Sequence, residues 1–439
     1  MNTGTGSGSM EATGQDWANW IGRYQDSSSI LHIIAVFTGR LDADRLRQAV
    51  QRTLALQPVL GCRFDETQEI ACWVPLEDRF RSDWVTTENG REPEAAAKKF
   101  IEEEALEDGR LLRVHLIQSA AGDVLCIKLD HACCDGAGAK AYLQLLGRMY
   151  SMVPESSSAE FVPEGAGVSW QASPPLRSSG QVFAACGIKD FRQAYQADKN
   201  KQGTSSTFPF LPGTSGQVRC EWLTFPHALL RGRAGGITVN DCLVAAYMRV
   251  LARYSRAEEA EQQPGRQTIH VTVDLRRYLN PEETPVVCNL SGMEKVNACL
   301  DHNESFGASV QKVHEAMLQV KSANPGLHSA ASMEFLAQIS YSKAKAALLQ
   351  ASSQVKAAGV SAPLLSNMGM MTQQEPLCFG EAAANRAYAV TPAMHAPAFM
   401  LGASSYGAEI TLTVSYFEHE HTGSQIAGFL AAMKKELTE

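Results

Sequence analysis

Short apolar runs and segments of helical spacing alternate along most of the chain. Runs rich in Ile, Leu and Val predict β-strands, whereas apolar residues that recur every three or four positions predict helices. The expected strands cover residues 30–37, 112–118, 124–129, 217–225, 268–275, 398–404 and 409–417. The expected helices cover residues 43–57, 93–106, 139–149, 239–254, 306–320, 334–350 and 423–437. This mixture predicts an α/β protein built of layered sheets and helices.

The periodic pattern stops between residues 153 and 183, where Ser, Pro and Gly dominate. Such a composition is typical of a linker, so we expect an N-terminal lobe at 21–152 and a C-terminal lobe at 184–439. Residues 1–20 begin with a run of Gly, Ser and Thr and lack the basic and apolar regions of a secretory signal. We therefore expect them to be a disordered lead or a cloning remnant.

The overall composition narrows the class of protein. A chain of 439 residues with 45% apolar residues can form one large two-lobed enzyme. The net charge of −8 argues against a nucleic-acid partner, and no apolar run is long enough for stable membrane insertion. The 11 cysteines include no CxxC pair, which favours buried reduced thiols and no metal site. We expect a cytoplasmic enzyme.

The candidate catalytic residue is His131, which follows the expected strand at 124–129. A strand end fixes the backbone of the histidine, and an imidazole can accept and return a proton near neutral pH. Asp135 lies four residues further along, in a loop predicted at 133–138 that contains two glycines. This spacing alone also fits a hydrogen-bonded structural histidine at a strand end, so both interpretations stay open.

A second charged residue lies in a similar position. Arg276 follows the apolar strand expected at 268–275. Asp135 is flanked by apolar residues and needs a cationic partner if it is buried. Arg276 can supply that partner, or it can simply be solvated.

Asp130 to Gly136 resembles the HHxxxDG motif of nonribosomal peptide condensation domains and the HxxxDG motif of alcohol and wax-ester acyltransferases. Further segments resemble this condensation-domain and HxxxD acyltransferase superfamily in the same order, namely residues 38–46, 57–64, 236–243, 274–276, 288–290 and 366–369. The resemblance covers about residues 30 to 430. It implies two chloramphenicol-acetyltransferase-like lobes, each a mixed sheet packed with helices, with a tunnel between them.

The resemblance also implies roles for individual residues. His131 matches the catalytic histidine, and Gly136 matches the glycine whose backbone amide lies near the reacting carbonyl. Asp135 matches a structural aspartate that pairs with the arginine matched by Arg276. Asp130 stands where peptide-forming members have their first histidine, which reduces the expectation of standard peptide-bond formation.

Three polar residues in the later motifs are candidates for substrate binding. Ser366 and Asn367 lie in the SNxG-like segment, and Asn289 follows Cys288, which replaces a glycine usual in the family. Asn367 can donate a hydrogen bond into the tunnel or act as a turn cap. His419 and His421 are expected to lie on a solvated face rather than to bind a metal.

The implied activity is acyl transfer from a thioester to an alcohol or amine. The donor is acyl-coenzyme A or an acyl-carrier protein acting in trans, with no bound cofactor. The acceptor is a small molecule of specialised-metabolite or lipid biosynthesis. Direct transfer needs no covalent intermediate, so Cys133 and Cys134 are not expected to be nucleophiles. Two alternatives remain: a homologue that binds pathway intermediates without transfer, and a His-assisted cyclisation catalyst.

Overall fold

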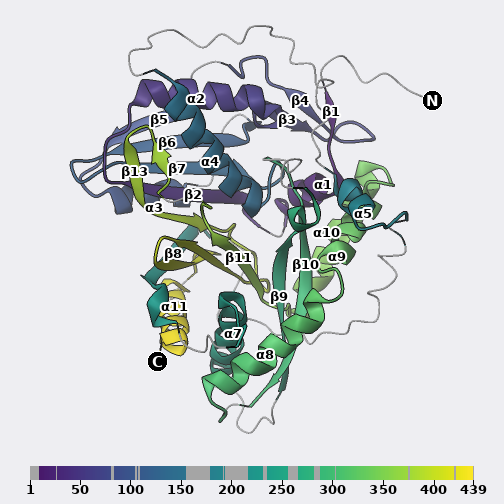
Figure 1. Ribbon diagram of the computed structural model, residues 1–439. Helices are drawn as coiled ribbons and strands as arrows, with labels where there is room; N and C mark the ends of the chain where they lie inside the picture. Colours follow the sequence, from purple (N-terminus) through teal and green to yellow (C-terminus); the bar gives the residue numbers. More distant parts are fainter. Residues whose placement is uncertain are drawn as a thin grey trace.

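The computed structural model (Figure 1) describes the chain with gaps. The described residues are 9–25, 27–80, 84–103, 106, 109–154, 178–190, 192, 216–230, 235–255, 265–280, 287–301, 303–373, 376–419 and 422–438. They form two six-stranded mixed sheets and a small three-stranded sheet. Each large sheet has its own apolar core. The expected α/β class with two lobes is confirmed.

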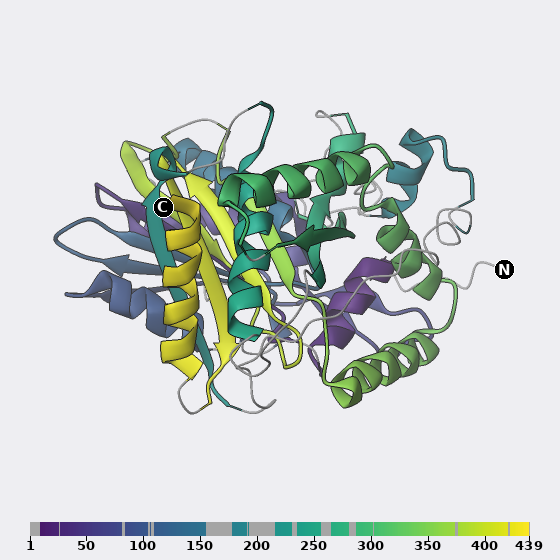
Figure 2. The same cartoon turned by 90° about the horizontal axis from the view of Figure 1, so that it is seen from below.

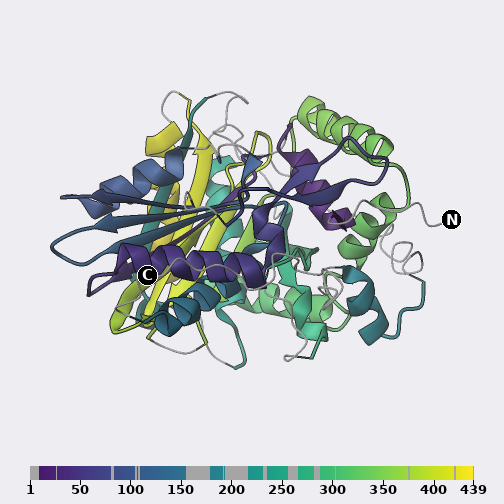
Figure 3. The same cartoon turned by 90° about the horizontal axis from the view of Figure 1, so that it is seen from above.

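The first large sheet has the strand order β12-β13-β2-β7-β6-β5. Its strands are β12 Cys378–Phe379, β13 Ala382–Val390, β2 Ile30–Phe37, β7 Val124–Asp130, β6 Leu112–Gln118 and β5 Val85–Asn89. Helices α2 (Ala43–Leu56) and α4 (Gly136–Met152) pack against each other over one face, as Figure 3 shows from above. Helix α3 (Pro93–Glu102) packs on the opposite face, towards the second sheet.

The second large sheet has the strand order β10-β9-β11-β14-β15-β8. Its strands are β10 Ser291–Leu300, β9 Gly265–Asp274, β11 Leu364–Met370, β14 Met400–Tyr406, β15 Glu409–Phe417 and β8 Val218–Pro226. Strand β11 is parallel to both of its neighbours, whereas the other pairs are antiparallel. Helices α7 (Val239–Ser255), α8 (Phe306–Lys321) and α11 (Thr422–Thr438) cover this sheet, and Figure 2 shows the yellow α11 beside α7.

Strand β13 joins the two parts of the chain. It lies after the expected linker in sequence, yet it pairs antiparallel with β2 and so extends the first sheet. Residues 378–390 therefore belong structurally to the N-terminal lobe, although the sequence division assigned all of 184–439 to the other lobe. Of the expected linker at 153–183, residues 155–177 lie outside the described part of the chain, and α5 (Ser179–Ala185) begins near its end.

The expectation of a disordered lead at 1–20 is wrong for its second half. Residues 10–11 form β1, and α1 covers Gly14–Gly22. The Thr13 side chain caps the helix and Asp16 completes a capping box, while Trp17 is fully buried. The helix forms because this cap satisfies its first N–H groups and Trp17 anchors it in the core. Residues 1–8 lie outside the described part.

Two other helix predictions need correction. The expected helix at 334–350 is two helices, α9 (Leu327–Leu336) and α10 (Tyr341–Ala358), with Ser340 at the N-cap of the second. The loop expected at 133–138 is shorter, because α4 starts at Gly136 with Asp135 as its N-cap. Among the described helices, none has both the length and the apolar character required to cross a bilayer.

Candidate active site

His131 lies where the first sheet meets the second. Its backbone N–H donates to the carbonyl of Ser29, and the N–H of Asp130 donates to Leu111, at 2.8 and 2.9 Å. These two bonds fix the end of β7 to the chain segments beside β2 and β6. The side chain of His131 is partly buried and lines a cavity. The strand end therefore sets the position of the imidazole.

The loop after His131 is held by side chains from distant segments. Asp130 Oδ1 accepts a hydrogen bond from the N–H of Ala132, at 2.9 Å. Asn289 Nδ2 donates to the carbonyl of Ala132 at 2.7 Å and to Asp16 Oδ1 at 2.9 Å. The amide oxygen of Asn289 accepts from Asn19. Asn289, a candidate for substrate binding, thus has both ends of its amide engaged within the protein and fixes the loop.

Asp135 and Arg276 form a buried ion pair with an N–O distance of 3.0 Å. Asp135 Oδ1 also caps α4 by accepting from Gly138, and Oδ2 accepts from Leu290. Burial alone raises the pKa of Asp135, but the Arg276 charge and these hydrogen bonds outweigh it, so that the pKa lies below its usual value. This is the pairing that the family resemblance implies, and it connects α4 to the end of β9.

Asp130, which replaces the family's first histidine, is also engaged. Its Oδ2 accepts from Arg23 at 2.7 Å, while Oδ1 holds the loop as described. The Arg23 guanidinium lies over the ring of Trp20, at 3.3 Å from the centroid. Both carboxylate oxygens are therefore occupied, and Asp130 ties the end of α1 to the loop that carries His131.

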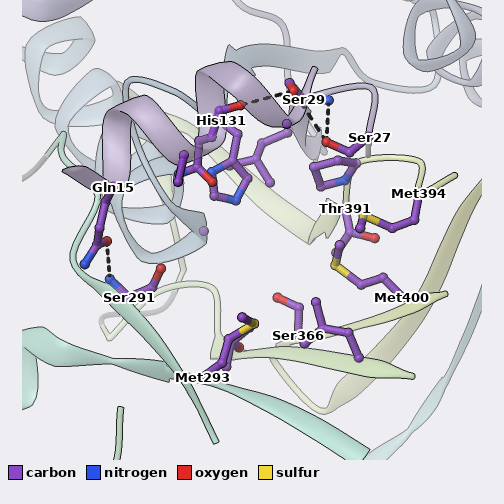
Figure 4. Close-up of a pocket in the computed structure, with 18 of the residues that line it drawn as sticks. Gln15, Ser27, Ser29, His131, Ser291, Met293, Ser366, Thr391, Met394 and Met400 are labelled. Atoms are coloured by element: carbon purple, nitrogen blue, oxygen red, sulfur yellow. Dashed lines mark hydrogen bonds between the residues drawn. The ribbon is translucent and has the colours of Figure 1, made fainter. Parts of the chain in front are cut away.

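The cavity beside His131 has a volume of about 350 Å³ and is lined by segments of both lobes (Figure 4). His131, Gly136 and Ser366 are the candidate residues that line it. Asn367 does not line it. Instead, Asn367 Nδ2 donates to Asn240 and its oxygen accepts from the N–H of Gly369, which stabilises the irregular end of β11.

The surroundings of His131 favour the neutral form of its imidazole by lowering its pKa. Burial lowers its pKa below the usual value, and the backbone carbonyl of the same residue and the charges of Asp135 and Asp130 oppose this effect only in part. A neutral imidazole with a lowered pKa can accept a proton at physiological pH. The arrangement therefore supplies a base at the wall of the cavity.

Gly136 is the first residue of α4 and lies at the cavity wall. A Cβ at this position would lie 3.1 Å from both Sδ and Cε of Met368, which is closer than normal packing allows. The N-terminus of a helix favours negative charge, because its first N–H groups have no partner within the helix. The N-terminus of α4 is thus suited to stabilise an oxyanion that forms in the cavity.

Several polar residues of the cavity wall were not found from the sequence, among them Gln15, Ser29 and Thr391. The Thr391 hydroxyl is buried and has no hydrogen-bond partner among the described residues. Gln15 lies in a segment that was expected to be disordered, and Thr391 follows β13, whose run of small residues gives no clear strand signal. The capping box of Thr13 and Asp16, on either side of Gln15, was the available signal for this helix.

The cysteines beside His131 are unsuited to nucleophilic chemistry. Cys133 and Cys134 are fully buried. A hydrogen bond to Cys133 and burial raise the pKa of Cys134 well above its usual value, so the thiol stays protonated. His419 is exposed, and His421 lies outside the described residues. Within the described ranges, no three His, Cys, Asp or Glu side chains gather as a metal site.

Comparison with known proteins shows what the sequence and the fold resemble. The condensation-domain family model matches residues 21–163. The uncharacterized protein Rv2305 of Mycobacterium tuberculosis is 23% identical over 269 residues, which make up 60% of each chain. The present chain thus matches less than two thirds of the length of this relative.

Solved structures extend the similarity to the whole chain. The trichothecene 15-O-acetyltransferase TRI3 from Fusarium sporotrichioides has a TM-score of 0.69 at 11% identity and covers 100% of this chain and 98% of its own. The first condensation domain of the CDA synthetase has a TM-score of 0.67 at 14% identity, with 99% and 97% covered. Polyketide synthase associated protein 5 from Mycobacterium tuberculosis has a TM-score of 0.63 at 15% identity, with 98% of each chain covered.

These similarities define a two-lobed protein with the fold of acetyltransferases and condensation domains. The resemblance to the condensation-domain superfamily, expected from the motifs around His131, is confirmed by the family match and by this fold.

Proposed function

We propose that the protein is an acyltransferase that moves an acyl group from a thioester to an alcohol or amine, with His131 as its general base. The observation that supports this most is the His131 imidazole at the wall of a cavity that both lobes line. The base is fixed at a strand end and can meet two substrates held in one cavity. Holding two reactants together supplies a large part of the rate advantage of such enzymes.

The proposed reaction is a direct transfer. His131 removes the proton from the acceptor hydroxyl or amine as that atom attacks the thioester carbonyl. The tetrahedral oxyanion forms near the Gly136 amide at the start of α4, where the helix end favours negative charge. The carbon–sulfur bond then breaks, and protonated His131 returns its proton to the departing thiolate.

The names of similar structures support a thioester donor. A starter condensation domain of rhizomide synthetase, with a TM-score of 0.64 at 14% identity, is described in complex with C8-CoA. The trichothecene enzyme is named as an O-acetyltransferase. For the present chain we propose acyl-coenzyme A or an acyl-carrier protein in trans as donor, and a small molecule of specialised-metabolite or lipid biosynthesis as acceptor.

The test is turnover with a panel of acyl thioesters and of alcohol and amine acceptors, with product masses measured. The proposal predicts a product heavier than the acceptor by the acyl group. His131→Ala should reduce turnover by at least about a hundredfold, whereas the exposed His419→Ala serves as the matched control and should retain it. Binding of thioesters without any product, or loss of water from one substrate, would contradict acyl transfer.

A further inference from the structure

The cavity beside His131 has an unusual chemical composition. Apart from His131, no titratable side chain lines it among the described residues. Four of the chain's 14 methionines lie in its wall, although their positions are far apart in the sequence. Met293 belongs to β10, Met333 to α9 and Met400 to β14, and Met394 lies between β13 and β14.

Three of these methionines converge on one part of the cavity. Figure 4 shows Met293, Met394 and Met400 around the space next to Ser366, below His131. The polar pair of Gln15 and Ser291, joined by a hydrogen bond of 3.2 Å, lies on the other side. The cavity thus has a methionine-rich side, which also holds Ser366 and Thr391, and a second polar group at Gln15 and Ser291.

The composition restricts what the cavity can bind. Away from the N-terminus of α4, a charged substrate group would lose its hydration there without meeting an opposite charge, which is energetically costly. Methionine is flexible and polarisable, so a wall of methionines adapts to an apolar ligand. A volume of about 350 Å³ is within the range of small-molecule sites.

We propose that the part of the cavity lined by Met293, Met394 and Met400 binds a flexible, uncharged aliphatic chain. The chain belongs to the acyl donor or to the acceptor, with its reactive end at His131. This inference rests on the proposed function only for the placement of that reactive end. These three methionines then determine chain-length specificity.

The test is a set of binding measurements that do not require turnover. Calorimetry with His131→Ala and wild-type protein compares acetyl-, butanoyl-, hexanoyl- and octanoyl-coenzyme A, and separately a series of primary alcohols from butanol to octanol. If the chain is buried, the affinity rises about two- to fourfold per methylene. The series that shows this slope identifies which substrate carries the chain. A flat slope in both series would overturn the proposal.

Variants of the methionines test whether these residues cause the increase in affinity with chain length. Met293→Gln combined with Met394→Gln should reduce an octanoyl-over-acetyl preference, or its alcohol equivalent, by about tenfold or more. The Leu versions of both positions should retain it. Met370→Gln is the matched control, because Met370 is 43% exposed and does not line the cavity.

Folding is checked by circular dichroism, and Met293→Gln alone provides a milder variant because Met293 is already 42% exposed. An unchanged preference in the folded double variant would overturn the proposal. Failure of the proposed function has a different signature: aliphatic ligands would still bind with the expected slope, but no thioester would give an acylated product.

Discussion

Removal of Arg276 should destabilise the protein by leaving a buried carboxylate without its counter-charge. Asp135 and Arg276 are both less than 10% exposed, at 3% and 9%. In Arg276→Ala, Asp135 keeps its hydrogen bonds from Gly138 and Leu290 but loses the cation. Loss of one partner from a buried pair costs about 3–5 kcal/mol. We expect the free energy of unfolding at pH 7 to fall by about that amount.

The effect should depend on pH in a defined direction. In the wild type, the pKa of Asp135 is lowered, so its stabilising contribution is present above the unfolded-state pKa of about 3.9 and is lost as the pH falls through the lower native value. Without Arg276, burial dominates and raises the pKa of Asp135. The folded variant then takes up a proton as the pH falls, and its stability deficit should shrink between pH 7 and pH 4.

The assay is urea unfolding of both proteins at several pH values, followed by circular dichroism. Arg386→Ala is the matched control, because Arg386 forms an ion pair with Glu94 of the same 3.0 Å length, but with side chains that are 36% and 69% exposed. An exposed pair contributes less than about 1 kcal/mol. A loss in Arg276→Ala no larger than in this control, or a deficit that does not change with pH, would refute the reasoning.

Three further predictions concern single side chains. His32 is buried with a pKa well below its usual value, mainly because of burial. The free energy of unfolding of the wild type should therefore decrease as the pH is lowered below about 6.5, by up to about 1.4 kcal/mol per pH unit. His32→Leu should reduce this slope in urea unfolding at several pH values, and an unchanged slope would contradict the prediction. Arg23→Gln removes the cation beside Asp130, so the negative charge near His131 is less compensated and the pKa of His131 should rise. The acid limb of the plot of kcat/KM against pH should then move to higher pH, and a shift to lower pH would contradict this. Thr391→Val removes a buried hydroxyl without a partner among the described residues. If this hydroxyl bonds to the substrate, kcat/KM should fall about tenfold while thermal stability is retained. Unchanged kinetics would exclude a contact with substrate.

The sequence predicted the parts of the fold that depend on local patterns. The strands at 30–37, 112–118 and 409–417 agree with the structure at both ends, because each is an apolar run with clear flanking turns. Asp42 caps α2 as its position before the apolar face suggested. The position of His131 at a strand end followed from the same local pattern.

Other features depend on contacts between distant segments. Strand β13 is rich in alanine, so its own residues do not predict a strand. It is a strand because it pairs with β2, which lies more than 340 positions earlier in the chain. The motifs suggested Asn289 and Asn367 as candidates for substrate contacts. In the structure they hydrogen-bond to Ala132 and Asn240, which lie in other parts of the chain. The group of Met293, Met394 and Met400 likewise forms only when separate segments of the chain meet.

The central claim is that the imidazole of His131 acts as the base. The most direct measurement is the pH dependence of kcat/KM for acyl transfer, which reports the ionisation of the free enzyme. The account predicts a rate that rises through an apparent pKa below about 6.5, because burial lowers the pKa of His131. In His131→Ala this limb should vanish with the activity, and survival of the same profile in that variant would contradict the account.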